Sequence, residues 1–305
     1  MPSAAPGASA GRRADRSGIL LMLGATLFFM GTNVFVKFLA DELSVFQVTW
    51  GRMLFHWLCF LPLFLLPRYR GRVRPNRPRL QLVRSAILYC TNTLFFGSLF
   101  YLTLATSASI MYAGPLILVV LSVLFLGEKV GPRRWAAVGF GFAGVLVIMQ
   151  PGGAFHWAML LPFGASVSFA LYQLVTRAIA ADDHPFTTMF WTPVVGIVAA
   201  SAVMPFVWQN PSPLGWLWLA CCGFTAGAGQ FLLIAAFARS EASLLAPFGY
   251  STLVWAALFG IAIFGNYPDT MTLLGAGLVV LAGLYIWIRE RQLGSAGGGG
   301  SPSPS

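Results

Sequence analysis

Charged side chains are scarce in this sequence, and their scarcity excludes a water-soluble globular fold. Asp, Glu, Lys and Arg make up 9% of the 305 residues, whereas about 25% is usual for soluble domains. Hydrophobic residues make up 57%, and the mean hydropathy is +0.76. These polar residues are too few to form the surface of a protein in water. We therefore expect an all-α integral membrane protein.

Acidic residues are the rarer of the two charged classes. The sequence has 9 Asp and Glu against 19 Lys and Arg, which gives a net charge of +10. Most of the basic residues lie in short segments between apolar runs, a distribution typical of membrane proteins. The basic balance therefore does not indicate a nucleic-acid partner.

Cysteine is also rare, and motifs for metals, nucleotides or catalysis are missing. The four cysteines lie in apolar runs and show neither CxxC nor any metal-ligand spacing. The sequence therefore indicates neither a disulfide framework nor a zinc site, and we interpret the cysteines as small core residues. No GxxxxGK[ST] segment is present to bind ATP. No Ser-His-Asp, HExxH or paired-carboxylate pattern is visible either, so we expect neither a cofactor nor an enzyme.

Long apolar runs, by contrast, fill the chain. A helix that crosses a bilayer needs about 20 mostly apolar residues. Ten segments meet this need, at roughly 18–40, 44–67, 80–104, 107–127, 133–151, 157–180, 185–208, 213–238, 242–265 and 270–289. We interpret residues 1–17 as an N-terminal tail and residues 291–305, rich in glycine and serine, as a disordered C-terminal tail.

Basic residues in alternate loops predict how the chain crosses the membrane. Arginines precede the first span, six lie between Arg68 and Arg79, and others follow the fourth and tenth spans. The loops at 151–155, 209–213 and 266–270 contain no Lys or Arg. Because Lys and Arg favour the cytoplasmic side, both termini are predicted to lie there, in an inner (plasma) membrane. We interpret the 68–79 cluster as a determinant of membrane topology, with binding of anionic lipid headgroups as a secondary role.

The chain contains two copies of one unit. A shift of 140 residues places Asn33 on Gln173 and Lys37 on Arg177, and a shift of 134 places TSASI on SEASL. We predict five-span repeats at 18–151 and 157–290. Because five is odd, the second copy enters from the opposite side, so the repeats are inverted. Inverted repeats are typical of secondary transporters.

The matched blocks also resemble a known family. The segment ASIMYAGPLILVVLSVLFLGEKVGPRRWAAVGFGFAGVLVI and its partner ASLLAPFGYSTLVWAALFGIAIFGNYPDTMTLLGAGLVVLAGLYI are similar to the drug/metabolite transporter superfamily, EamA type. This resemblance implies a carrier of amino acids, nucleotides, vitamins such as riboflavin, S-adenosylmethionine or drugs. Asn266 stands where the family usually has the glutamate seen at Glu128, a difference that bears on gating.

Helix-breaking residues occupy matching spans of the two repeats. Pro115 lies in the fourth span, and Pro247 and Gly249 lie in the ninth. Proline kinks a helix and frees a carbonyl, and paired interruptions of this kind point to a transport site. We predict that these residues shape a gate and that the neighbouring Tyr112 and Tyr250 contact solute. A packing kink without ligand contact is the alternative.

Arg52 and His56 are the ionisable side chains deepest in a predicted span. An arginine near the bilayer centre costs about 2.5–3.5 kcal/mol, and no Asp or Glu lies mid-span to neutralise it. We predict that Arg52 binds a carboxylate or phosphate of the solute, with snorkelling to the headgroups as the alternative. His56, one turn further, is predicted to bind substrate or carry a proton, with a core role as the alternative. Arg84 lies one turn inside the third span on the cytoplasmic side, where its side chain can snorkel to the headgroups, so we attribute its charge to membrane topology alone.

Uncharged polar residues and glycines complete the predictions. Asn33 and Gln173 stand out because they occupy matching repeat positions, and Asn92 and Gln230 join them as candidate solute ligands. Hydrogen bonds between helices, without a ligand, are the alternative. Close packing of the fifth and tenth spans is predicted from their glycines, Gly139, Gly141, Gly144, Gly275, Gly277 and Gly283.

Together these patterns favour a secondary transporter of small anionic or zwitterionic metabolites that works by alternating access. Membrane lipids, a solute and a coupling ion or counter-solute are the expected partners, and the protein is expected to be a monomer or homodimer. An intramembrane lipid-modifying enzyme is the alternative, and a multi-span scaffold without substrate is a third hypothesis.

Overall fold

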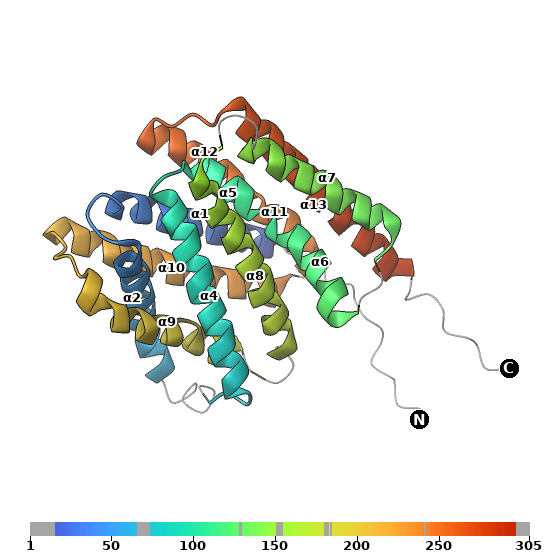
Figure 1. Ribbon diagram of the computed structural model, residues 1–305. Coiled ribbons are helices and arrows are strands. Elements are labelled where there is room, and N and C mark those ends of the chain that lie inside the picture. The colour runs from blue at the N-terminus through green and yellow to red at the C-terminus, as the bar shows by residue number, and fades with distance from the viewer. Residues whose placement is uncertain are drawn as a thin grey trace, which may run out of the picture.

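The computed structural model describes residues 16–65, 74–127, 130–150, 155–179, 183, 185–240 and 242–296. For a few residues in these ranges, Arg177 among them, it describes the backbone alone. Several predictions fall on residues outside the described part, namely those for Glu128, for Arg68 to Arg72, and for most of both tails. The described part of the chain is helical and contains no strand, which confirms the predicted fold class (Figure 1).

The helices follow one another with short connections. In chain order they are α1 Arg16–Leu39, α2 Val45–Leu65, α4 Pro78–Leu99, α5 Leu104–Met111, α6 Gly114–Leu126, α7 Pro132–Met149, the 3₁₀ turn η1 Trp157–Met159, α8 Leu160–Ile179, α9 Pro185–Val207, α10 Pro213–Arg239, α11 Ala242–Gly249, α12 Ser251–Phe264 and α13 Thr270–Ala296. Each predicted span is one α-helix, except that 107–127 is divided into α5 and α6, and 242–265 into α11 and α12; the span 157–180 begins with the turn η1 before α8.

Helix ends are set by residues that the backbone requires there. Proline is the first residue of α4, α7 and α10. The N–H group at this position has no hydrogen-bond partner within the helix, so the missing N–H of proline costs nothing there. Gly127 ends α6 at φ 65° and Gly265 ends α12 at φ 64°. Both are left-handed caps that favour glycine. They are 138 residues apart, the same offset that separates Glu128 from Asn266.

By length and composition, seven of the described helical segments can cross a membrane. The predicted count of ten is therefore too high by this measure. The three remaining predicted spans, α2, α4 and α7, are helical, but they carry Arg52, Arg84 and Arg134. Such side chains lower the average hydropathy of a helix even when the helix is enclosed by others.

Equivalent helices of the two repeats run antiparallel. Gly141 of α7 lies against Ala282 of α13, and Gly144, one turn later, lies against Leu278, one turn earlier. In the same way, the Trp50 indole N–H of α2 donates to the Ser201 hydroxyl of α9 over 2.9 Å. Since α7 and α13, and α2 and α9, are the corresponding helices, the repeats are inverted relative to each other (Figure 1).

Packing between the other helices has the same twofold pattern. α1 packs against α10 as α8 packs against α4, and α2 contacts α10 as α9 contacts α4. Close packing at glycine is confirmed for Gly141, Gly144 and Gly275, whereas an added Cβ at Gly139 or Gly277 would meet nothing within 4 Å. The prediction of close packing was wrong at those two positions, because they face away from the partner helix.

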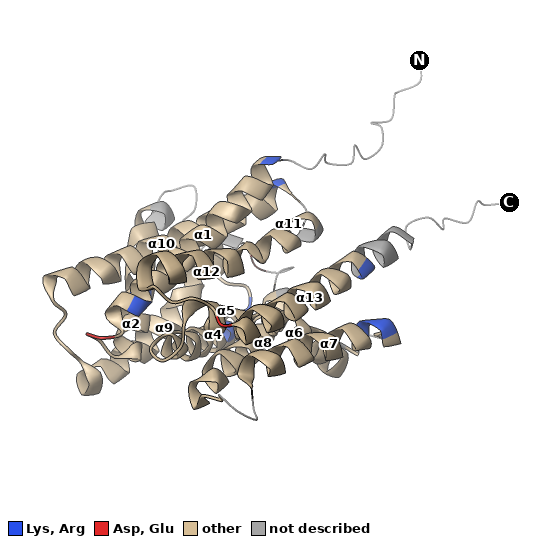
Figure 2. Ribbon diagram, turned by 90° about the horizontal axis from the view of Figure 1, so that it is seen from above, with Lys and Arg blue, Asp and Glu red and all other residues tan. Residues whose placement is uncertain are grey.

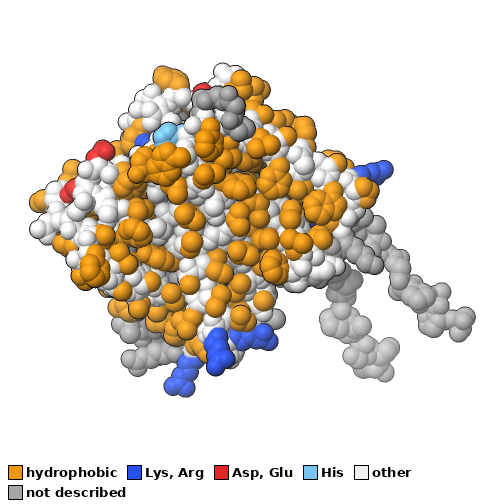
Figure 3. All heavy atoms as spheres, in the orientation of Figure 1, with side chains coloured by type: hydrophobic (Ala, Val, Ile, Leu, Met, Phe, Trp, Pro, Cys, Tyr) orange, Lys and Arg blue, Asp and Glu red, His pale blue; other side chains and the backbone are white. Residues whose placement is uncertain are grey.

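Polar and apolar side chains are distributed as a lipid environment requires. Large apolar residues such as Leu124, Phe125 and Phe206 are exposed, while Gln47, Gln81 and Arg84 are buried. Hydrophobic side chains cover most of the face in Figure 3, with Lys and Arg at its lower and right edges and Asp and Glu at the upper left. Figure 2 likewise shows basic residues at the ends of α1, α7 and α13 nearest the chain termini.

Candidate functional site

The two broken helices meet at the interface of the repeats. α5 ends at Met111 and α6 begins at Gly114, while α11 ends at Gly249 and α12 begins at Ser251. The Tyr112 hydroxyl donates to the Gly249 carbonyl over 2.5 Å, and the rings of Tyr112 and Tyr250 lie 5.0 Å apart. The interruptions predicted from proline and glycine therefore coincide in space as well as in repeat position.

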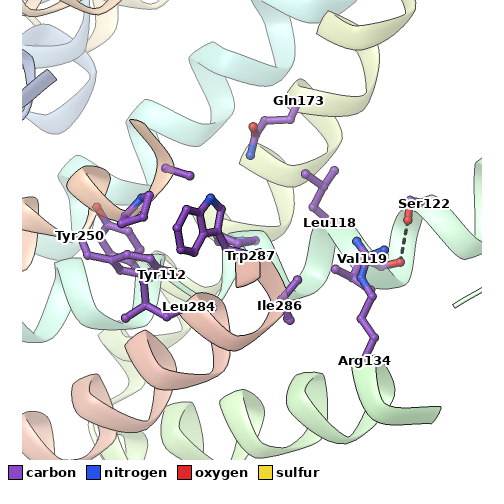
Figure 4. Close-up of a pocket in the computed structure, with 14 residues that line it drawn as sticks. Tyr112, Leu118, Val119, Ser122, Arg134, Gln173, Tyr250, Leu284, Ile286 and Trp287 are labelled. Carbon is purple, nitrogen blue, oxygen red and sulfur yellow. Dashed lines mark hydrogen bonds between the residues drawn. The ribbon is translucent and has the colours of Figure 1, made fainter. Parts of the chain in front are cut away.

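A cavity of about 260 Å³ lies beside this contact, and we name it the tyrosine cavity. Five of the predicted site residues line it, namely Tyr112, Pro115, Gln173, Pro247 and Tyr250. The other lining residues are Leu118, Val119, Ser122, Arg134, Ala246, Gly283, Leu284, Ile286 and Trp287. Figure 4 shows the two tyrosines at one end, Trp287 in the middle, and Arg134 reaching in from α7.

The polar groups of the tyrosine cavity differ in how they are satisfied. The Gln173 amide points into the cavity and makes no hydrogen bond with the described residues (Figure 4). The Ser122 hydroxyl donates to the carbonyl of Val119 over 2.9 Å, so it keeps a lone pair to accept from a ligand. An amide, a hydroxyl and a guanidinium in a wall of aromatic rings can bind a flat polar solute.

The Tyr250 ring fits here because residue 283 is glycine. A Cβ added at Gly283 of α13 would overlap the Tyr250 hydroxyl. The sequence predicted Gly283 as a helix-packing residue, whereas the structure places it in the wall of the tyrosine cavity.

Comparison with known proteins decides the family. The model of the EamA-like transporter family matches residues 16–150 and again residues 156–288. The chain belongs to the EamA-like transporter family.

Named relatives of this EamA-like protein carry two different solutes. An S-adenosylmethionine uptake transporter of Rickettsia bellii is 27% identical over 261 residues, which are 85% of this chain and 89% of that protein. A riboflavin transporter of Rhizobium johnstonii is 29% identical, with 90% and 92% of the two chains covered. A solved crystal structure with 18% identity covers 92% of this chain and 99% of its own, at a TM-score of 0.65, which supports the fold alone.

Arg52 and His56 of this EamA-like protein lie outside the tyrosine cavity. The Arg52 guanidinium carbon is 5.7 Å from the centroid of the Phe96 ring, and its Nε atom is buried without a hydrogen-bond partner. His56 is 6% exposed, and its ring lies 5.5 Å from that of Phe60. Arg52 forms no ion pair within the described part of the chain.

The remaining predicted site residues have separate positions. The Asn92 amide donates to the carbonyl of Leu88 in its own helix over 2.9 Å. The Asn33 amide has only a weak contact, 4.0 Å from the Met30 sulfur. Gln230 lines a second cavity and makes no hydrogen bond with the described residues. The structure therefore does not bring these three amides together with Tyr112 and Tyr250.

Arg84 was attributed to topology, and that interpretation was wrong. Its side chain is 3% exposed and does not reach the surface. Its guanidinium donates to the hydroxyls of Thr176 and Thr192, each over 2.8 Å, and to that of Tyr172. The depth of Arg84 within its span does not reveal these contacts, because the hydroxyls belong to α8 and α9, between 88 and 108 residues further along the chain.

Sequence reasoning also missed Arg134 and Trp287 as cavity residues. By sequence, Arg134 belongs to the basic loop after the fourth predicted span, and a tryptophan near the end of a span, such as Trp287, is most simply an anchor at the membrane interface. Both lie within helices whose neighbouring residues face the other repeat. The helical spacing from Arg134 to Val138, a buried residue on the same face, is the signal that points inward.

Proposed function

We propose that this EamA-like protein is a secondary carrier that moves small organic metabolites across the inner membrane by alternating access. One observation carries the proposal: two helix breaks at equivalent positions of inverted repeats meet through the Tyr112–Gly249 hydrogen bond beside a cavity. Interrupted helices at the repeat interface form the solute site in many such carriers. The family match names transporters, and no observation favours the lipid-modifying alternative.

The proposed membrane orientation has both termini in the cytoplasm. Basic residues gather at the end of the bundle near Arg16, Arg133 and Arg289, and alternate loops lack them. Arg134 is next to Arg133 in the chain and lines the tyrosine cavity, so the cavity lies toward that same end of the bundle. In this orientation the cavity is reached from the cytoplasmic side, and its closure there with opening at the other end completes a transport cycle.

The proposed solutes are anionic or zwitterionic metabolites that carry a flat ring. Tyr112, Tyr250 and Trp287 offer aromatic faces for stacking, and Gln173 and Arg134 offer hydrogen-bond donors. S-adenosylmethionine and riboflavin, the solutes named for two relatives, both contain a flat heteroaromatic ring. Arg52 is proposed to meet a carboxylate or phosphate during the cycle, and His56 to carry a coupling proton if protons drive transport.

Flux into proteoliposomes tests this proposal. We expect saturable uptake of labelled S-adenosylmethionine, which carries both a flat ring and a carboxylate, and we expect either Tyr250→Ala or Arg52→Ala to lower that uptake by about tenfold or more. Loss of one buried charged contact weakens binding by about 1.5–3 kcal/mol, which is about tenfold or more. Gly277→Ala, at a position with open space around it, is the matched control.

Two results would contradict the proposal. One is solute turnover in detergent without any compartment, which indicates an enzyme. The other is unchanged flux in both folded variants, which removes the tyrosine cavity and Arg52 from the solute path.

A further inference from the structure

The carbonyls freed by the break between α11 and α12 accept hydrogen bonds from side-chain hydroxyls. The Leu253 N–H, which a continuous helix would direct to the Gly249 carbonyl, donates to the Tyr250 carbonyl over 3.0 Å. The Gly249 carbonyl accepts instead from the hydroxyls of Tyr112 and Thr252, the latter over 3.0 Å. Because a carbonyl freed in the membrane interior needs another donor, side chains decide where this break lies.

Thr26 of α1 contacts this break from outside the broken helix. Its Oγ1 lies 2.7 Å from the Oγ of Ser251, the first residue of α12, and it accepts from the Trp255 indole N–H over 3.2 Å. The Ser251 hydroxyl is also 2.7 Å from the Phe248 carbonyl at the break. The Thr26 hydroxyl is also 2.9 Å from the Leu23 carbonyl in its own helix.

Two hydroxyl protons serve these contacts, and either arrangement of them links α1 to α12. If Thr26 donates to Ser251, then Ser251 donates to the Phe248 carbonyl. If Ser251 donates to Thr26, then Thr26 donates to the Leu23 carbonyl. The Thr26–Ser251 hydrogen bond is present in both arrangements. Since Thr26 is 4% exposed, loss of this bond would leave a buried hydroxyl without its partner in the other helix.

The first repeat has the equivalent packing without the equivalent bond. Helix α6 begins at Gly114, and a Cβ added there would lie 3.6 Å from the Ser166 carbonyl oxygen of α8. Ser166 follows Thr26 by 140 residues, the shift that relates the two repeats. Because residue 114 is glycine, it has no hydroxyl to bond Ser166. This position therefore links the second repeat's break to α1 and leaves the first repeat's break without such a link.

We propose that Thr26 is a positioning residue of the tyrosine cavity, an inference that rests on the solute site proposed there. Thr26 itself does not line the cavity. Through Ser251 it fixes the direction in which α12 leaves the break, and Ser251 directly follows Tyr250 in the chain. The Tyr250 ring, which lies 5.0 Å from the Tyr112 ring, therefore keeps its place in the cavity wall only while this bond is made.

Fluorine NMR of the Tyr250 ring tests the proposal without any solute. The full chain is labelled with 3-fluorotyrosine and measured in detergent, and the Tyr250 signal is the one that Tyr250→Phe removes. We expect Thr26→Val, which keeps the shape of the side chain and removes its hydroxyl, to displace or broaden this signal. Thr26→Ser keeps the hydroxyl, so it should leave the signal at its native position.

Thr32→Val is the matched control on the same helix. Thr32 is 3% exposed, its hydroxyl donates to the Phe28 carbonyl over 3.2 Å, and it is 3.0 Å from the Thr225 hydroxyl of α10. Neither Thr32 nor Thr225 lines the tyrosine cavity. Thr32→Val therefore removes the same kind of buried hydrogen bond, and it should leave the Tyr250 signal unchanged.

Solute affinity provides a second measurement on the same variants. Thr26→Val should weaken S-adenosylmethionine binding to the purified protein by about threefold to tenfold, the effect expected from the loss of one neutral hydrogen bond. Thr26→Ser and Thr32→Val should bind S-adenosylmethionine as tightly as the native protein does. This difference separates a role in placing Tyr250 from a general contribution of buried threonines to stability.

The proposal is overturned if the Tyr250 signal of folded Thr26→Val stays at its native position, or if Thr32→Val moves it equally far. Ser251→Ala removes the other hydroxyl of the pair and should move the signal in the same way, so it decides the question where Thr26→Val does not fold. Because the NMR measurement uses no solute, absence of S-adenosylmethionine binding contradicts the proposed solute site alone. An unmoved signal, in turn, leaves the proposed transport unaffected.

Discussion

At the scale of single residues, Gly283 determines where the Tyr250 ring lies. A methyl group at residue 283 would overlap the Tyr250 hydroxyl, so Gly283→Ala displaces either the ring or helix α13. We expect this substitution to weaken solute binding in the tyrosine cavity by about tenfold or more while helical content is unchanged. Solute-dependent thermal stabilisation of the purified protein measures the effect.

Two further variants separate this contact from a general glycine effect. Gly277→Ala adds the same methyl group to the same helix where nothing lies within 4 Å, so binding should stay at the native level. Tyr250→Phe combined with Gly283→Ala removes the oxygen atom that the methyl group meets, and it should restore α13 packing in part. Equal solute binding by Gly283→Ala and Gly277→Ala would disprove the role given to Gly283.

At the scale of helices, the Lys37 side chain links α1 to the C-terminal end of α4 by hydrogen bonds. Its ammonium group donates to the carbonyls of Leu99 and Leu102 over 3.2 and 2.9 Å. A cation at a helix C-terminus is favoured by the unpaired carbonyls and by the helix dipole. Lys37→Met keeps the apolar stem and removes the donors. We expect it to lower the free energy of unfolding by about 1–3 kcal/mol.

Denaturant unfolding in detergent measures this change. Arg133→Met is the matched control, because it also replaces a long basic side chain and residue 133 is exposed at the start of α7. If both variants unfold at the same denaturant concentration as the native protein, the Lys37 bonds contribute nothing to stability.

At the scale of the whole molecule, the inverted repeats predict opposite positions for equivalent residues. Lys37 and Arg177 correspond by sequence, so they should lie near opposite membrane surfaces. In a background with the native cysteines replaced, an impermeant thiol reagent should label Lys37→Cys from outside intact cells. It should label Arg177→Cys only after the cytoplasmic face is opened. Labelling of both from the same side would refute the inverted arrangement in the membrane.

The sequence by itself determined the helical class, the two copies of one unit and the places where paired helices break. These features depend on short patterns in the sequence or on patterns that recur along it, so hydropathy and the positions of proline and glycine predict them directly. They led to Tyr112, Gln173 and Tyr250, which share one cavity. Only the tertiary structure decided that Arg84 is buried among hydroxyls and faces the same cavity as Asp183. The physical reason is that the partners of a polar side chain are chosen by packing between helices distant in the chain, and no local pattern records that choice.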